Sequence, residues 1–314
     1  MADRTRILHI AGYSRTGSTL LGRVLAQLPG FVAVGEFSAF WASVANPEQL
    51  CGCGVPVRDC PFWSEVLDRA FGGAANMNLA RCTGLQAEFL DKPSRLERGT
   101  LRGAKREKAY AEYVDVVRRI YESVAAVSGC KVIVDATKIP HFSHILRKTG
   151  SFDVRVLHLV RDSRAVVHSW RRPKRRADTR SGTATMPEKE AHVASLGYDI
   201  ANLETHLMGW LGLPYERIRY EDFTRDPLGV TRRIVDLVGE PTANLDFIGA
   251  RSVHLSVQSH TVWGNPDRTQ MGEVTIREDD EWRAKLPKKD RGLATALTWP
   301  LLLAYGYVGP FARR

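Results

Sequence analysis

The chain has 314 residues, of which 44% are hydrophobic and 25% are charged, a balance typical of a globular enzyme. Its net charge of +10 favours an anionic partner, such as a phosphorylated cofactor, an anionic substrate, nucleic acid or a membrane surface. We find no clean apolar run of roughly 18 residues, no signal peptide, no linker and no internal repeat. We therefore expect a cytoplasmic protein with one α/β domain over residues 1–314 and helical insertions.

The first expected elements are a short strand, a loop and a helix. Residues 6–11 are largely apolar and end at Gly12, as a buried strand would. Residues 19–28 carry leucine and valine at helical spacing, and Pro29 with Gly30 ends this run. A strand, a glycine-bounded turn and a helix are the context of a phosphate-binding loop. An ordinary turn between a strand and a helix is the alternative.

The loop departs from the nucleoside-triphosphate pattern at one position. The frame G-x-x-x-x-G-K-S/T is met at Gly12, Gly17 and Thr19, but Ser18 stands where the lysine belongs. That lysine normally reaches the β- and γ-phosphates. Here Arg15 is the cation of the loop, and the backbone N–H groups can still bind a phosphate. The loop therefore predicts a phosphate-bearing ligand other than ATP.

Further apolar runs predict strands that alternate with helices. The expected strands are residues 31–34, 131–134, 154–160 and 218–220, and the expected helices are 37–45, most of 63–128, and 163–172. This alternation indicates a mostly parallel sheet that is covered on both faces. Ligands bind such sheets beyond the carboxyl ends of the strands. The polar residues that we expect at this edge are Arg15, Glu36, Asp135, Lys138, Arg161 and Tyr220.

Three of the five cysteines lie close together, as Cys51, Cys53 and Cys60, in a loop that contains glycine and proline. A structural zinc site usually has C-x-x-C pairs or added histidines, and this C-x-C-x₆-C spacing fits that pattern poorly. A disulfide would not persist in a reducing compartment. We therefore expect a tight loop with buried thiols and no metal, and zinc is the minor alternative.

Two segments bear on contact with nucleic acids or membranes. Residues 171–176 form the densest basic cluster, which is either a patch for nucleic acid or anionic lipid, or a solvated, mobile loop near a phosphate site. We expect the loop. Residues 293–311 are apolar but are broken by Pro300 and Pro310. We expect a C-terminal helix packed on the core, with at most weak peripheral contact with a membrane.

Several motifs in a fixed order identify a family. The loop at residues 13–19 is followed, after the strand at 154–160, by Arg161 and, eight residues later, by Ser169. Three further segments match in order, namely Gly35-Glu36, Arg219–Phe223 with Asp226-Pro227, and His260–Arg268. Together they resemble the sulfotransferases that use 3′-phosphoadenosine-5′-phosphosulfate (PAPS). The resemblance covers residues 7–282.

This resemblance implies a P-loop-NTPase-like three-layer α/β fold and a cofactor site. The 5′-phosphosulfate of PAPS would bind the first loop, and the 3′-phosphate would bind Arg161 and Ser169. The other residues implied in cofactor binding are Arg15, Thr16, Gly17, Ser18 and Thr19 in the loop, Tyr220 against the adenine, and Arg268 beside the 3′-phosphate. The product would be adenosine 3′,5′-bisphosphate.

The resemblance also implies in-line transfer of a sulfuryl group to a hydroxyl of an acceptor, which depends on positioning and on charge stabilisation. Arg15 would stabilise the leaving phosphate, and Lys138 the sulfuryl group. Glu36 is the expected general base. The rival base is His141, which lies one residue out of register because the family's histidine falls on Pro140. We expect no metal in the reaction, and the acceptor is an unidentified small molecule, lipid or sugar.

Two other functions remain alternatives. A P-loop kinase would use ATP and Mg²⁺, against which Ser18 in the lysine position argues. A non-enzymatic basic module would bind nucleic acid and would show aromatic residues interleaved with basic ones. The basic run at residues 171–176 has only Trp170 nearby, so we expect no nucleic-acid partner.

Overall fold

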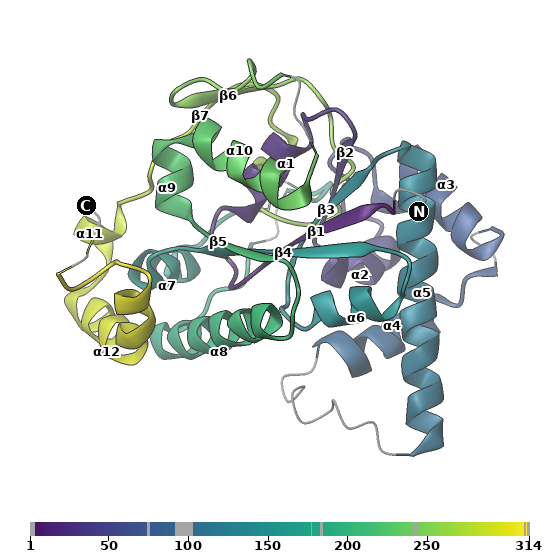
Figure 1. The fold of residues 1–314 in the computed structure, drawn as a ribbon, viewed down its shortest axis with the longest axis horizontal. Helices are drawn as coiled ribbons and strands as arrows, with labels where there is room; N and C mark the ends of the chain where they lie inside the picture. The colour runs from purple at the N-terminus through teal and green to yellow at the C-terminus, as the bar shows by residue number, and fades with distance from the viewer. Residues whose placement is uncertain are drawn as a thin grey trace.

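The computed structural model describes residues 4–73, 76–91, 103–176, 178–182, 185–240, 244–310 and 312. A five-stranded sheet of order β2-β3-β1-β4-β5 crosses its centre, and every neighbouring pair of strands is parallel (Figure 1). The strands are β1 (Arg6–Ala11), β2 (Phe31–Gly35), β3 (Val132–Lys138), β4 (Asp153–Val160) and β5 (Tyr215–Arg219). None of the described helices is both long and apolar enough to cross a membrane.

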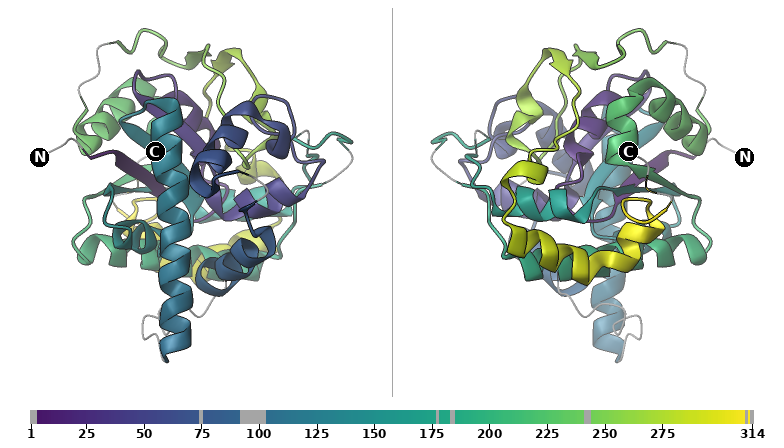
Figure 2. Two further views of the ribbon diagram at one scale, coloured as in Figure 1. Left: turned by 90° about the vertical axis from the view of Figure 1, so that its right-hand side faces the viewer. Right: turned by 90° about the vertical axis from the view of Figure 1, so that its left-hand side faces the viewer.

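Helices cover both faces of the sheet, because the side chains of each strand alternate between two hydrophobic clusters (Figures 1 and 2). In β1, Ile7 enters one cluster, and Leu8 and Ile10 enter the other. The first face carries α2 (Phe40–Ala45), α3 (Pro61–Phe71), α4 (Leu79–Gln86), α5 (Ala104–Ser128) and α6 (Phe142–Lys148). The second carries α1 (Ser18–Leu25), α9 (Tyr220–Arg225), α10 (Pro227–Val238) and the hairpin of β6 (Ser252–Leu255) and β7 (Gly272–Thr275).

A third cluster lies beyond the end of β4. It joins α7 (Ser163–Arg171), α8 (Ala191–Trp210), α11 (Trp282–Lys285) and α12 (Lys288–Ala304). The expected packing of the C-terminal helix is confirmed, since Ala294 and Leu301 of α12 belong to this cluster. The shorter elements are the 3₁₀ helices Phe37–Ala39, Val57–Asp59 and Pro266–Thr269 and the π-helix Ala87–Asp91.

The three-layer α/β arrangement confirms the predicted P-loop-like fold class. The predicted strand ending at residue 220 instead ends at Arg219, and Tyr220 begins α9. The strand predicted at 131–134 continues to Lys138. Helix α8 and the β6–β7 hairpin were not predicted. Residues 74, 75 and 92–102 of the expected helical region lie outside the described part of the chain.

Asp135 does not stand at the ligand-binding edge as we expected. Its carboxylate is fully buried, where it accepts hydrogen bonds from the Tyr121 hydroxyl at 2.5 Å and from the Thr137 N–H at 2.7 Å. These bonds hold the side chain inside the protein, and β3 continues past it to Lys138. Burial raises the pKa of Asp135 to about 6, although the two hydrogen bonds oppose the shift.

This shift predicts a pH-dependent loss of stability. The folded chain holds the Asp135 proton more tightly than the unfolded chain, so its stabilisation is present below about pH 4 and is lost as the pH rises to about 6. Over this range, the unfolding free energy of the wild type should fall by up to about 3 kcal/mol relative to Asp135→Asn. Urea unfolding at several pH values measures this difference. The exposed Asp246→Asn is the control, and parallel pH profiles for wild type and Asp135→Asn would refute the prediction.

Candidate active site

A cavity of about 630 Å³ opens beyond the carboxyl ends of the strands, in the size range of a nucleotide-sized ligand. Every strand of the sheet contributes to its wall. The contributing residues are Ser14, Arg15, Gly17, Ser18 and Thr19 in the loop after β1, Glu36 after β2, Lys138 at the end of β3, Arg161 after β4 and Tyr220 after β5. The convergence of these residues follows from the parallel sheet, because all five strands end at one edge.

The loop after β1 is held in a conformation that bulky residues rarely adopt. Gly17 has φ 88° and precedes α1, and its missing Cβ would lie 2.6 Å from the Tyr220 ring. Arg15 also has a positive φ, of 72°. Such a left-handed turn can direct successive N–H groups toward one point, as anion-binding loops do. Thr19 contributes differently, because its hydroxyl accepts the Asn265 N–H at 3.0 Å and so joins the loop to a distant segment.

Arg15 reaches the cavity between side chains from two other segments. Its guanidinium lies 4.8 Å from the Trp170 ring centroid, a cation–π contact, and 3.1 Å from the Met186 sulfur. Burial lowers the pKa of Arg15, although Glu36 opposes the shift, and arginine remains charged. The structure thus fixes a permanent positive charge within the loop after β1, at the cavity wall.

Glu36 and Lys138 form an ion pair at the cavity wall. Lys138 Nζ lies 2.6 Å from Glu36 Oε1 and also donates to the Ala136 carbonyl at 3.0 Å. Lys138 has φ 62°, and among the described residues only it and Arg15 are non-glycine residues with a positive φ. Both strained residues line the cavity, which is where proteins concentrate such conformations. The rival base His141, at the start of α6, is not part of the cavity wall.

Arg161 connects three parts of the site. Its guanidinium donates to the Arg15 carbonyl at 3.1 Å and to the Asp279 carbonyl at 3.0 Å, pairs with the Asp279 carboxylate at 3.1 Å, and lies 4.6 Å from the Tyr220 ring centroid. Ser169, two turns along α7, lines the same cavity. The acidic partner of Arg161 is thus Asp279, and neither Asp162 nor Asp135, although Asp162 is its neighbour in the sequence.

Arg268 does not reach the cavity. Its side chain is fully buried, and its guanidinium donates to the carbonyls of Thr261 and Leu50 and lies 3.5 Å from Asp178. These bonds tie three backbone segments together. The structure therefore separates Arg268 from the other residues of the expected cofactor site.

The family model of sulfotransferases matches residues 8–244. The chain belongs to the sulfotransferase family. Among solved structures, a sulfotransferase domain from the curacin biosynthetic pathway aligns over 95% of this chain and 97% of its own at 15% identity, with a TM-score of 0.52, which shows a shared fold. The sulfotransferase domain of the Synechococcus PCC 7002 olefin synthase aligns over 95% of this chain and 96% of its own at 21% identity, with a TM-score of 0.49. Sulfotransferase STF9 from Mycobacterium avium aligns over 97% of this chain and 77% of its own at 14% identity, with a TM-score of 0.46. Among curated proteins, none matches the sequence.

This sulfotransferase also has charged residues in the cavity wall that are outside the family motifs, although Arg172 and Lys174 belong to the basic cluster at 171–176. The basic ones are Arg23, Arg172, Lys174 and Arg277, and the acidic ones are Glu278, Asp279, Asp280 and Glu281. Residues 277–281 follow the β6–β7 hairpin, which the sequence pattern did not predict, so nothing placed them near the loop. The one signal in the sequence was the run of four acidic residues that follows Arg277.

The basic cluster at 171–176 is tied to the site by specific contacts. Arg171 and Arg172 form ion pairs with Glu190 and Glu281 at 2.8 and 3.0 Å. Arg176 pairs with Asp178 at 2.9 Å, and its guanidinium lies 3.8 Å from the Trp263 ring centroid. Of these residues, Arg172, Glu281 and Trp263 line the cavity, so the basic cluster borders it.

The close contact between Gly17 and Tyr220 predicts the effect of a methyl group in the loop. Gly17→Ala combines a left-handed φ with a clash against the ring, so we expect the unfolding free energy to fall by about 1–3 kcal/mol. Chemical denaturation measures the loss. Gly22→Ala in α1 is the matched control, because no atom lies within 4 Å of the added Cβ and alanine favours a helix. An equal loss in both variants would contradict this explanation.

Proposed function

We propose that this sulfotransferase moves a sulfuryl group from PAPS to a hydroxyl of an acceptor. The observation that supports the proposal is that one cavity is lined by two separate elements whose chemistry suits the binding of an anion. The loop at residues 14–19 is the first, and Arg161 with Ser169 is the second. PAPS carries a 5′-phosphosulfate and a separate 3′-phosphate and therefore needs two such elements. A triphosphate presents one continuous chain of charge, and Ser18 replaces the lysine that would bind its far end.

Cofactor binding would use the residues that already face the cavity. The hydroxyls of Ser18 and Thr19 and the backbone N–H groups of the loop would hold the 5′-phosphate, with Gly17 allowing the turn. The side chain of Thr16 would not take part, because its buried hydroxyl donates to the Tyr13 carbonyl at 3.1 Å. Arg161 would exchange its ion pair with Asp279 for the more strongly charged 3′-phosphate. The Tyr220 ring lies next to both elements and would contact the adenine. Because Arg268 lies outside the cavity, we leave it out of this site.

In the transfer step, Glu36 would take the proton of the acceptor hydroxyl. The acceptor oxygen then forms a bond to sulfur while the bond between sulfur and the bridging phosphate oxygen breaks. Arg15 would neutralise the charge that develops on the leaving phosphate. Lys138, which pairs with Glu36 before the reaction, would be released toward the sulfuryl oxygens once Glu36 is protonated and neutral. The products are the sulfated acceptor, a small molecule, lipid or sugar, and adenosine 3′,5′-bisphosphate.

The cofactor assignment predicts a selective binding profile. Isothermal titration should show tight binding of adenosine 3′,5′-bisphosphate without Mg²⁺ and weaker binding of Mg-ATP. Arg161→Ala should weaken the bisphosphate about ten- to a hundredfold, because it removes charge-assisted hydrogen bonds to the 3′-phosphate. The exposed Arg251→Ala is a control of equal charge change. A preference for Mg-ATP would support the kinase alternative and reject PAPS as the donor.

The role of Glu36 predicts a loss of turnover without a loss of cofactor affinity. Glu36→Gln keeps the shape and an oxygen for Lys138 but cannot take a proton, so kcat should fall about 10²- to 10⁴-fold. The assay follows labelled sulfuryl transfer from PAPS to acceptors found by screening, with bisphosphate affinity measured in parallel. Exposed Glu65→Gln in α3 should behave as the wild type. Full activity in Glu36→Gln would move the base to another group, with His141 the first to be tested.

A further inference from the structure

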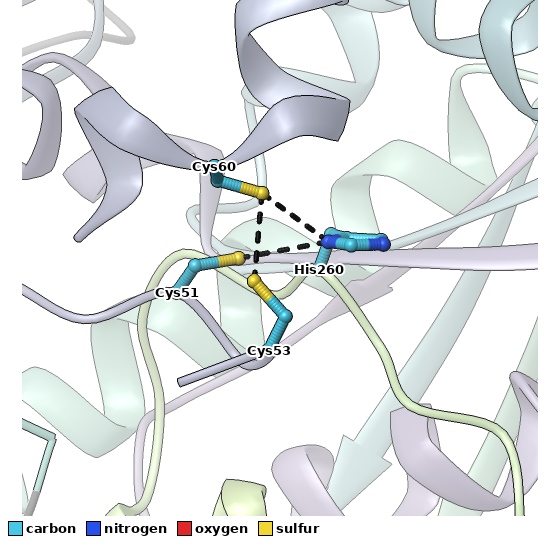
Figure 3. Close-up of side chains that lie close together, drawn as sticks. All are labelled: Cys51, Cys53, Cys60 and His260. Atoms are coloured by element: carbon cyan, nitrogen blue, oxygen red, sulfur yellow. Dashed lines mark hydrogen bonds between the residues drawn. The ribbon is translucent and has the colours of Figure 1, made fainter. Parts of the chain in front are cut away.

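Four potential metal ligands converge outside the cavity. Cys51, Cys53 and Cys60 come from the loop between α2 and α3, and His260 comes from the segment that follows β6 (Figure 3). None of the four lines the cavity. Cys60 and His260 are 200 residues apart in the sequence. From the spacing of the cysteines we expected buried thiols without a metal, because the fourth potential ligand, His260, is so distant in the sequence.

The distances between the ligand atoms match those around a tetrahedral metal ion. The sulfurs of Cys53 and Cys60 are 3.6 Å apart, and His260 Nδ1 lies 3.3 Å from the Cys60 sulfur and 3.9 Å from the Cys51 sulfur. All four ligand atoms lie within 4.8 Å of one another. A zinc ion with bonds of about 2.3 Å to sulfur and 2.0 Å to nitrogen places its ligands about 3.5–3.8 Å apart.

We propose that Cys51, Cys53, Cys60 and His260 form a structural Zn²⁺ site. Three thiolates and one imidazole are a ligand set that zinc prefers in closed structural sites. Four protein ligands leave no position for a water or a substrate. The site would therefore stabilise structure and take no part in the transfer step.

The surroundings of the four side chains are those of a metal site. The backbone N–H groups of Cys53, Val55 and Trp63 lie against the sulfurs of Cys51, Cys53 and Cys60 respectively, where they would stabilise thiolates. The Phe62 ring stacks on His260 at 4.7 Å between centroids and 11° between planes. Trp63 Nε1 donates to the His260 carbonyl at 2.7 Å. These contacts orient the ligands without any metal ion.

A disulfide explains the cluster less well. The sulfurs of Cys53 and Cys60 are 3.6 Å apart, whereas a disulfide requires about 2.05 Å. A disulfide between Cys53 and Cys60 would also leave the proximity of Cys51 and His260 unexplained. All three cysteines are free in the structure.

The site would hold one wall of the cavity in place. Gly52 N–H donates to the Thr261 carbonyl at 2.9 Å, and a Cβ on Gly52 would lie 2.3 Å from the Ser259 carbonyl oxygen. The chain then continues to Trp263, Gly264 and Asn265, which line the cavity. Through Asn265 this segment contacts Thr19 of the phosphate-binding loop. A metal at His260 would thus fasten the cysteine loop to a segment that borders the site.

Elemental analysis of the full chain, purified without chelators from zinc-supplemented medium, tests the proposal. We expect one zinc per chain in the wild type and its loss in Cys60→Ser and in His260→Ala. Cys130→Ser, which alters a half-buried cysteine outside the cluster, should keep the metal. Replacement by Co²⁺ in the wild type should give the visible absorption of cobalt bound to thiolates in tetrahedral geometry, so the test does not depend on the folding of a variant.

Three outcomes would overturn the zinc site. They are a wild-type chain without bound zinc, a zinc content unchanged in folded Cys60→Ser, and a Cys53–Cys60 disulfide found by peptide mass spectrometry. None of these measurements involves PAPS or an acceptor. Their result is therefore independent of the proposed transfer reaction.

Discussion

The position of β1 between β3 and β4 is the constraint on which the cavity depends. Because the three strands are parallel, the loop after β1 is flanked by Lys138 at the end of one neighbour and by Arg161 after the other. Arg161 donates directly to the backbone of that loop, at the Arg15 carbonyl. The helices between β2 and β3 pack on one face of the sheet, and Tyr121 of α5 binds Asp135 in β3.

The backbone conformation helps to position the two cations Arg15 and Lys138 in the site. Arg15 and Lys138 both adopt left-handed conformations, each at a cost of about 1–3 kcal/mol, which the surrounding structure must offset. Strand pairing supports Lys138, which lies in register with Ala11 of β1, and the Arg161 guanidinium supports Arg15 by donating to its carbonyl. The ion pair with Glu36 then restrains the flexible lysine side chain. Such preorganisation favours electrostatic stabilisation, since the charges need not be reoriented during a reaction.

The sequence predicted the position of candidate site residues that directly follow a strand. Glu36 and Arg161 could be placed because apolar runs mark the strands and parallel strands end together. Residues that depend on contacts between distant segments could not be placed. Asp279 meets Arg161 across 118 residues, and His260 joins cysteines near the N-terminus, so no local pattern links them. Asp135 turned inward because a tyrosine hydroxyl from α5 met it, and hydrophobic periodicity carries no information about such a partner.

The cysteine cluster has a consequence for the order in which the chain folds. Its three thiols lie within ten residues, from Cys51 to Cys60, so a metal ion could bind them while the rest of the chain is unfolded. His260 follows 200 residues later, so its binding closes a long loop at a cost in conformational entropy, which the folded sheet offsets by bringing the two segments together. Coordination by His260 would therefore require that the fold has brought the two segments together. Metal coordination would in this way link an early local turn to the last step of tertiary assembly.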